Sequence, residues 1–174
     1  MLKDMPGLKN PFAKRKRGNR LIFAVAKNVG ENGINGDPQL LKSINNICSD
    51  NNYKIRRDGV LFFKEYFKTG TEKIVKTERF KETYLPTLLD FINDEDLEIQ
   101  IDAIEAVCEV LDQINTEDIE NDFIPCVLNN LDIQNQNQIE IVQRMSEAFG
   151  TVVYKMSLIG IHLKYRKELV EYYK

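Results

Sequence analysis

The chain has 174 residues, of which 43% are hydrophobic and 29% charged, the balance of one ordinary globular domain. Its longest apolar runs, such as residues 21–26, are too short to span a bilayer, so we expect no membrane span. Cys48, Cys108 and Cys126 form no Cys-x-x-Cys pair and favour a reducing compartment, where we expect them to be small core residues. We expect a cytoplasmic protein, with the nucleus and the cilium as alternatives.

The N-terminal residues carry most of the excess basic charge. The formal net charge is −3, but residues 1–20 hold seven basic residues and one acidic residue, so the remainder is acidic. Residues 1–19 contain two prolines, two glycines and no sustained periodicity, which predicts a flexible arm. The centre of this arm is a basic run that suits an acidic partner, including nucleic acid or tubulin, or nuclear import, with a solvated tail as the plain alternative. The run consists of Lys14, Arg15, Lys16 and Arg17.

Nucleic acid is the less favoured partner of this arm. Its basic residues are not interleaved with aromatic side chains, and the acidic remainder of the chain repels phosphates. An acidic protein is therefore the favoured partner of the basic run, and the solvated tail stays the alternative.

Residues 20–31 have apolar side chains at helical spacing and predict the first helix. The segment 32–38 ends it, because Gly and Asn tolerate positive φ and Pro38 suits the start of a helix. This first helix resembles the second half of a hairpin whose first half is missing. Residues 38–49 and 52–68 then predict a complete helix hairpin, and we expect some aromatic rings of its second helix to face a neighbouring unit.

The clearest hairpin lies between residues 84 and 114. Apolar residues recur at helical spacing on both sides of the acidic break 93–96, whose aspartates suit an N-cap. Two amphipathic helices joined by so few residues fold back on each other. Because one hairpin cannot bury both apolar faces by itself, we expect further copies of it to pack alongside.

Such copies exist at spacings of 39 to 47 residues. When the hairpin is shifted 44 positions upstream, Asp94 falls on Asp50 and Ala103 falls on Gly59. Ala103 and Gly59 are small, which suits a close approach of neighbouring helices. A shift of 39 positions downstream matches residues 84–86 with 123–125. Two helices per unit at this spacing are typical of HEAT repeats. The sequence therefore predicts an all-α, HEAT-like α-solenoid of three to four stacked antiparallel helix hairpins, with an ordinary helical bundle as the alternative. The expected units are residues 38–68, 78–114 and 119–156, followed by a terminal helix over 158–173, within a domain of residues 20–174.

The expected terminal helix, residues 158–173, carries an apolar face that nothing later in the chain covers. Solenoids need terminal units with a polar outer side. We therefore expect either a fragment of a longer solenoid or an end that docks on another protein.

The residues give little support to catalysis. No glycine-rich phosphate loop, nucleophile motif or metal-ligand spacing occurs, and His162, the only histidine, reads as a helix-surface or packing residue. We expect no enzyme, no cofactor and no metal.

Two groups of residues are candidates for binding a partner. The first is an acidic strip on one helix, which would face a basic partner, with a solvated face as the alternative: Glu98, Asp102, Glu105, Glu109 and Asp112. The second is a ridge formed by the turns inside the hairpins: Asn51, Asn52, Tyr53, Arg56, Arg57, Asp94 and Glu95. Arg56 and Arg57 have a structural alternative, because they would also reach aspartates of an adjacent turn.

These turns resemble a known family. The run from Ile47 to Arg57, and the segment 84–107, are similar to HEAT repeats of scaffold and regulatory subunits of type-2A protein phosphatases, and most similar to type-4 phosphatase regulatory subunits. Gln100 stands where that family usually has an arginine. The resemblance covers about residues 20–150 and implies a non-catalytic scaffold that holds a Ser/Thr phosphatase catalytic subunit on the turn ridge. A structural adaptor subunit of a large cytoskeletal, ciliary or transport assembly is the alternative function.

Overall fold

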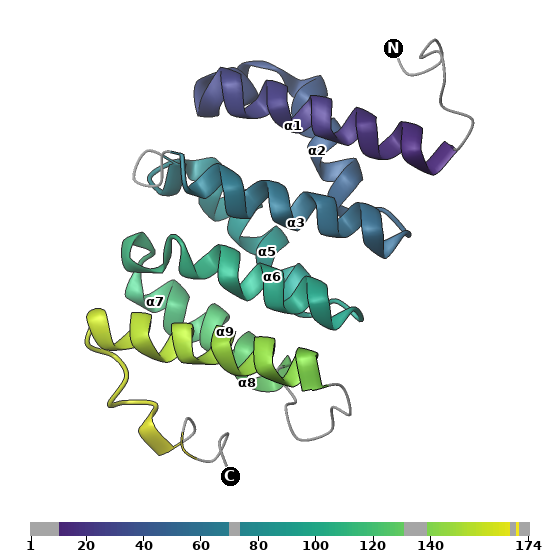
Figure 1. The fold of residues 1–174 in the computed structure, drawn as a ribbon. Helices are drawn as coiled ribbons and strands as arrows, with labels where there is room; N and C mark the ends of the chain where they lie inside the picture. The colour runs from purple at the N-terminus through teal and green to yellow at the C-terminus, as the bar shows by residue number, and fades with distance from the viewer. Residues whose placement is uncertain (1–10, 70–73, 131–138, 168–169, 171–174) are drawn as a thin grey trace.

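The computed structural model describes residues 11–69, 74–130, 139–167 and 170 of the 174-residue chain, and every regular element in these ranges is helical (Figure 1). The prediction of an all-α protein is therefore confirmed. The elements, with π-helical segments η1 and η3 and a 3-10 turn η2, are α1 (Pro11–Gly36), α2 (Pro38–Cys48), α3 (Tyr53–Phe67), η1 (Phe80–Tyr84), α5 (Leu85–Ile92), α6 (Leu97–Cys108), η2 (Leu111–Gln113), α7 (Thr116–Asp118), η3 (Ile119–Phe123), α8 (Ile124–Asn130) and α9 (Ile139–Leu158).

The helices form two layers (Figure 1). Helices α1, α3, α6 and α9 lie side by side and run in the same direction; we call them the second helices, because each of the last three closes a hairpin. The first helices of those hairpins, α2, η1–α5 and η3–α8, lie behind them. Helix α3 packs on α6, and α6 packs on α9, so neighbours in the row are also neighbours in the chain.

Short polar side chains start the helices where the sequence predicts it. Asp37, Asn52 and Asp96 each have an extended backbone and accept hydrogen bonds from amide groups of the following first turn, at 3.0 to 3.3 Å. Such caps satisfy amide groups that no helical carbonyl can reach. The caps at Asn52 and Asp96 fix the turns that join α2 to α3 and α5 to α6.

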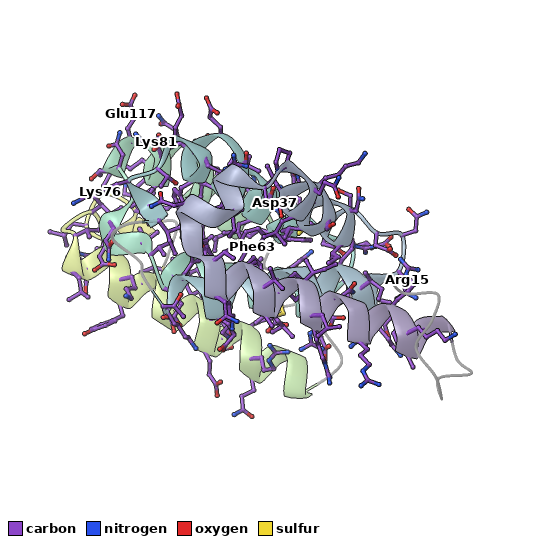
Figure 2. All side chains as sticks on the ribbon, turned by 90° about the horizontal axis from the view of Figure 1, so that it is seen from above. Arg15, Asp37, Phe63, Lys76, Lys81 and Glu117 are labelled. Carbon is purple, nitrogen blue, oxygen red and sulfur yellow. The ribbon has the colours of Figure 1, made fainter. Side chains whose placement is uncertain are left out.

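Aromatic side chains of α3 hold three consecutive units together. Phe62 stacks on Phe23 of α1 with ring centroids 4.6 Å apart, and Phe63 lies 5.3 Å from the ring of Tyr84 in η1. Viewed along the row, Phe63 lies between the two layers (Figure 2). The expectation that these rings face neighbouring units is confirmed.

The N-terminal arm is shorter than predicted. Helix α1 begins at Pro11, so residues 11–19 are helical and the basic run Lys14–Arg17 is part of a helix; residues 1–10 lie outside the described part of the chain. A proline is tolerated in the first helical turn, where its amide has no helical partner anyway. Gly18 and Asn19 are buried. The backbone of α1 is non-helical at Gly30, with a φ of 64°, so the first helical stretch ends next to the predicted end at residue 31 and a second, short stretch continues to Gly36.

The terminal helix predicted over 158–173 is wrong for residues 159–165. Helix α9 ends at Leu158, and Gly160 has a φ of 82°, in the left-handed region that favours glycine. The amide of Ile161 donates to the carbonyl of Met156 at 3.1 Å, and that of Gly160 to Ser157 at 3.3 Å. These two bonds form a Schellman cap, which stops the helix.

Candidate functional site

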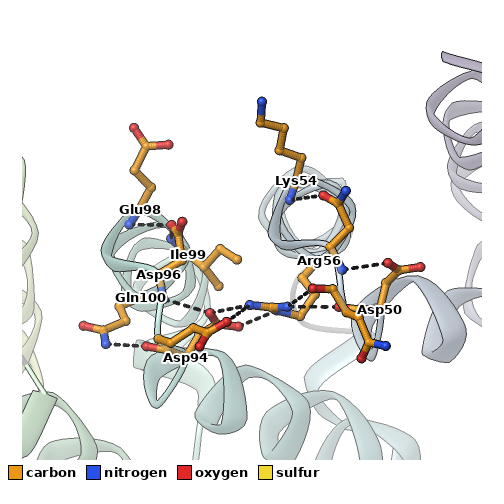
Figure 3. A network of polar contacts seen from close by, with 11 residues as sticks. Asp50, Lys54, Arg56, Asp94, Asp96, Glu98, Ile99 and Gln100 are labelled. Atoms are coloured by element: carbon orange, nitrogen blue, oxygen red, sulfur yellow. Dashed lines mark hydrogen bonds and ion pairs between the residues drawn. The ribbon is translucent and has the colours of Figure 1, made fainter. Parts of the chain in front are cut away.

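Arg56 joins two consecutive turns and is the centre of a polar network (Figure 3). Its Nε and Nη2 atoms donate to both carboxylate oxygens of Asp94, at 2.7 and 2.9 Å, and Nη1 donates to the carbonyl oxygens of Asp50 and Asn51 at 3.0 and 3.2 Å. The hydrogen bond to Asp94 is the main reason why the pKa of Arg56 is raised above its ordinary value. A two-point contact of this kind fixes orientation as well as distance. Arg56 therefore sets the position of the α5–α6 turn relative to the α2–α3 turn.

Asp102 on α6 connects three second helices. Its Oδ2 accepts from Nε of Arg57 on α3 at 2.7 Å, and its Oδ1 accepts from Nη2 of Arg144 on α9 at 2.9 Å. The Asp102 side chain is only 4% exposed. Partial burial lowers the pKa of Arg57, but the hydrogen bond and charge of Asp102 outweigh that effect, so its pKa is raised.

The predicted acidic strip is neutralised within the chain. Glu98 pairs with Arg57, Glu105 with Lys64, and Glu109 with Lys68 at 3.8 Å. Asp102 is buried between two arginines, and only Asp112, in η2, is exposed without an ion pair among the described residues. The expectation of a free acidic strip is therefore wrong. The cations of α3 face this strip because α3 and α6 lie side by side.

The basic run of α1 makes the same kind of contact one unit earlier. Arg15 pairs with Asp50, and Lys16 pairs with Asp58 at 3.1 Å. Further along the same two helices, Lys27 of α1 lies 3.6 Å from Glu65 of α3. Lys14 and Arg17 make no ion pair with the described residues. The basic run is thus divided, with two cations used inside the fold and two left at the surface.

The two sets of ion pairs repeat in register. The three cations of α3 stand 41 positions after the three cations of α1. The acids that the α3 cations bind stand 44 positions after the acids that the α1 cations bind. The pairs Arg15–Asp50, Lys16–Asp58 and Lys27–Glu65 become Arg56–Asp94, Arg57–Asp102 and Lys68–Glu109. We call these six pairs the ion-pair ladder. The ladder shows that α1 meets α3 in the same way as α3 meets α6.

Gln100 marks where the ladder changes. It stands 44 positions after Arg56, and its Nε2 donates to the carbonyl oxygen of Asp94 at 2.6 Å, as Arg56 donates to that of Asp50. Its buried Oε1 accepts no hydrogen bond from a described residue. At the contact between α6 and α9 the charges are exchanged: the acid, Asp102, lies on the earlier helix and the cation, Arg144, lies on the later one.

The turn ridge keeps an exposed set of side chains once its arginines are assigned to the fold. Asn51, Asn52 and Tyr53 at the start of α3 are exposed, and so is Glu95 between α5 and α6. Asp94 is held by Arg56 and also accepts from the amide of Asp96 at 2.9 Å. Arg56, Arg57 and Asp94 therefore build the turns, as the structural alternative predicted. Asn52, which caps α3, and Glu95, whose carboxylate lies 3.5 Å from Nη2 of Arg56, also take part but stay exposed.

The remaining candidates for chemistry lie apart from one another. His162 is half-buried in the turn after α9, and its buried Nδ1 atom has no hydrogen-bond partner among the described residues. Burial raises the pKa of Cys48 and of Cys108 to about 12 each, which keeps both thiols protonated. Within the described ranges, no three His, Cys, Asp or Glu side chains are arranged to hold a metal ion. No helix in these ranges is both long and apolar enough to cross a membrane.

Sequence reasoning overlooked Asp58, Lys64, Lys68 and Arg144 as members of the network. Equivalent positions of two units were compared, and this comparison detects only whether the same charge recurs. The useful comparison is between a residue and its opposite charge about 41 positions later, as for Lys64 and Glu105. Across the contact between α3 and α6, the paired residues are 38 to 45 positions apart, on both sides of the repeat of 44.

Comparisons of the chain with models of known protein families, with curated proteins and with solved structures give no match. We infer its function from its own residues.

Proposed function

We propose that the protein is a HEAT-like α-solenoid that works as a non-catalytic scaffold for other proteins. The observation that carries this proposal is the ion-pair ladder, because a contact repeated in register is what stacked copies of one unit produce and a bundle around one closed centre does not. In such stacks each unit contacts only its neighbours, so the turns and helix faces stay available along the row. Scaffolds of this kind bind by surface rather than by a catalytic pocket.

The turn ridge is the proposed binding surface. Its exposed members, Asn51, Asn52, Tyr53 and Glu95, combine amides, an aromatic ring and a carboxylate on a rigid support. Arg56 locks the two turns together through Asp94, so a partner meets a surface that is already ordered. Preorganisation of this kind lowers the entropy cost of binding. The ridge is also the place where the resemblance to phosphatase regulatory subunits lies, so a Ser/Thr phosphatase catalytic subunit is the proposed partner.

A pull-down with the full chain tests this proposal. Purified chain should retain a Ser/Thr phosphatase catalytic subunit, and the ridge variant Tyr53→Ala/Glu95→Ala should lose at least about tenfold in affinity, as central aromatic anchors of interfaces commonly do. Leu61→Ala is the matched control, since Leu61 is exposed on α3 but lies away from the turns. Equal binding by all three proteins would remove the ridge from the proposal. No binding by the unmodified chain would remove the phosphatase.

The second candidate function is a structural adaptor whose basic helix docks on an acidic protein of a large assembly. It is favoured by Lys14, Arg17 and Arg20, which make no ion pair among the described residues. Reversing all four charges of the basic run would damage the fold, because Arg15 and Lys16 belong to the ladder. The informative variant is therefore Lys14→Glu/Arg17→Glu. Normal incorporation of this variant into the assembly would count against the adaptor.

A further inference from the structure

A cleft lies between α2 and α5, two consecutive first helices, next to the turn ridge. Its volume is about 410 Å³, which is within the range of ligand-binding sites. The C-terminal end of α2 forms one wall, η1–α5 form the other, and the pair of Arg56 and Asp94 lines the cleft where it meets the ridge. We call it the α2–α5 cleft. Its other side chains with polar oxygen or nitrogen atoms are Asn45, Ser49, Thr83, Thr87 and Asp90.

Side chains bridge the corresponding gap one unit later. Asn93 at the end of α5 stands 44 positions after Ser49, the residue that ends α2. Oδ1 of Asn93 accepts from Nδ2 of Asn130 on α8 at 2.7 Å, and Nδ2 of Asn93 lies 3.8 Å from Sγ of Cys126 on the same helix. The Ser49 hydroxyl makes no such bond to α5 among the described residues. The α2–α5 cleft is thus open at a place that side chains of the next unit close.

The charge that the cleft leaves unpaired is negative. The guanidinium of Arg56 makes five hydrogen bonds, to Asp94, to Glu95 and to two carbonyl oxygens, which is as many as it has N–H donors (Figure 3). It therefore has no donor left for an anionic ligand. Asp90 is exposed and makes no ion pair within the described part of the chain. The cleft accordingly presents one free carboxylate.

The groups beside Asp90 add acceptors and an apolar wall. The Thr87 hydroxyl donates to the carbonyl oxygen of Thr83 at 2.7 Å, so toward a ligand this hydroxyl can only accept. Helix α2 ends at the cleft, and the C-terminal end of a helix carries a partial negative charge. Cys48 and Phe91, both buried, supply apolar surface. Lysine and arginine side chains match this lining, because they carry a positive charge, only donors, and an apolar stem.

We propose that the α2–α5 cleft binds a lysine or arginine side chain of a protein that docks on the turn ridge, with Asp90 as its counter-ion. The inference rests on the proposed function, since it takes the ridge as the docking surface, and it adds the chemistry of the partner. Because Asp90 is exposed, the ion pair selects among partners more than it adds affinity.

Two-dimensional ¹H–¹⁵N NMR of the full chain tests the proposal with four pentapeptides that differ only in the central residue, which is lysine, arginine, norleucine or glutamate. The lysine and arginine peptides should shift amide signals of residues 45–49 and 83–91 in a saturable way. A Kd of about 1 mM is expected for a single side chain, and raising the salt from about 50 to about 500 mM should weaken it. The norleucine and glutamate peptides should leave these signals in place.

Three variants assign the binding to the cleft. Asp90→Asn keeps the size of the side chain and removes its charge, so the lysine peptide should bind about three- to fivefold more weakly. Asp112→Asn is the matched control, an exposed acid outside the cleft, and should bind like the unmodified chain. Ser49→Asn introduces the side chain that bridges the gap in the next unit and should weaken binding to a similar extent as Asp90→Asn. Unchanged signals outside the cleft show that each variant is folded.

Two results would overturn the proposal: equal shifts with all four peptides, or lysine binding that Asp90→Asn leaves unchanged. A chain that retains a phosphatase through its ridge but binds no basic peptide would overturn this inference alone. A chain that binds the basic peptides through Asp90 but retains no phosphatase would support the cleft's preference for cations and remove the phosphatase from the proposed function.

Discussion

Asp102 offers the sharpest test of how the second helices are held together. Replacing it by Asn keeps the size of the side chain but removes its charge. Arg57 and Arg144, whose side chains are 31% and 28% exposed, would then face each other without the carboxylate that both bind. We expect the Asp102→Asn chain to fold and to be less stable.

The magnitude follows from the burial of the three groups. Breaking a fully buried ion pair by removing one partner costs about 3–5 kcal/mol, whereas exposed pairs contribute about 0–1 kcal/mol. Asp102 is 4% exposed but its partners keep nearly a third of their surface in water, so we expect a loss of about 2–3 kcal/mol. With a urea dependence of about 2 kcal/mol per molar, the unfolding midpoint should fall by about 1 M.

Urea unfolding followed by circular dichroism at 222 nm measures this change. Asp112→Asn is the matched control, since Asp112 is exposed and has no ion pair among the described residues, and its effect should stay within about 0.5 kcal/mol. In a double-mutant cycle, Asp102→Asn and Arg144→Gln together should cost at least about 1 kcal/mol less than their sum. An Asp102→Asn chain as stable as the unmodified one would refute the reasoning, because it would mean that the buried carboxylate contributes nothing net.

Further predictions concern packing and the thiols. A Cβ at Gly59 would lie 2.9 Å from Sγ of Cys48, so Gly59→Ala should destabilise the fold by about 1–2 kcal/mol. A Cβ at Gly150 in α9 would meet open space, so Gly150→Ala should stabilise the fold by about 0.5–1 kcal/mol. Thermal unfolding distinguishes the two signs. A disulfide reagent at pH 8 should modify only half-buried Cys126 in the folded chain and all three thiols in denaturant. Burial raises the pKa of Cys48 and Cys108 from 9.0 to about 12, so their share of the stability is present below pH 9 and is lost as the pH rises toward 12. Unfolding midpoints at pH 8 and pH 10.5 check that sign, and a midpoint that does not fall at the higher pH would contradict it.

Local signals in the sequence predicted the helices and their order well. Apolar periodicity and caps such as Asp96 are properties of one segment, and the structure has helices where they point. The small residue expected at Gly59 is confirmed, because the Sγ of Cys48 occupies the space that a Cβ would need. The same local reasoning was wrong for residues 11–19, where a proline and a glycine suggested an arm. Contacts made by Arg15 and Lys16 hold these residues in a helix, and those contacts come from another part of the chain.

The sequence by itself determined that the chain is all-α, built from helix pairs of similar length, because periodicity and capping act within a few residues. Only the tertiary structure decided which charges meet. Helices α3 and α6 pack side by side, and this places the cations of α3 against the acids of α6. It turned a predicted acidic surface into an internal contact. Which faces of two helices meet depends on the shapes of the side chains on both helices, which no single segment contains.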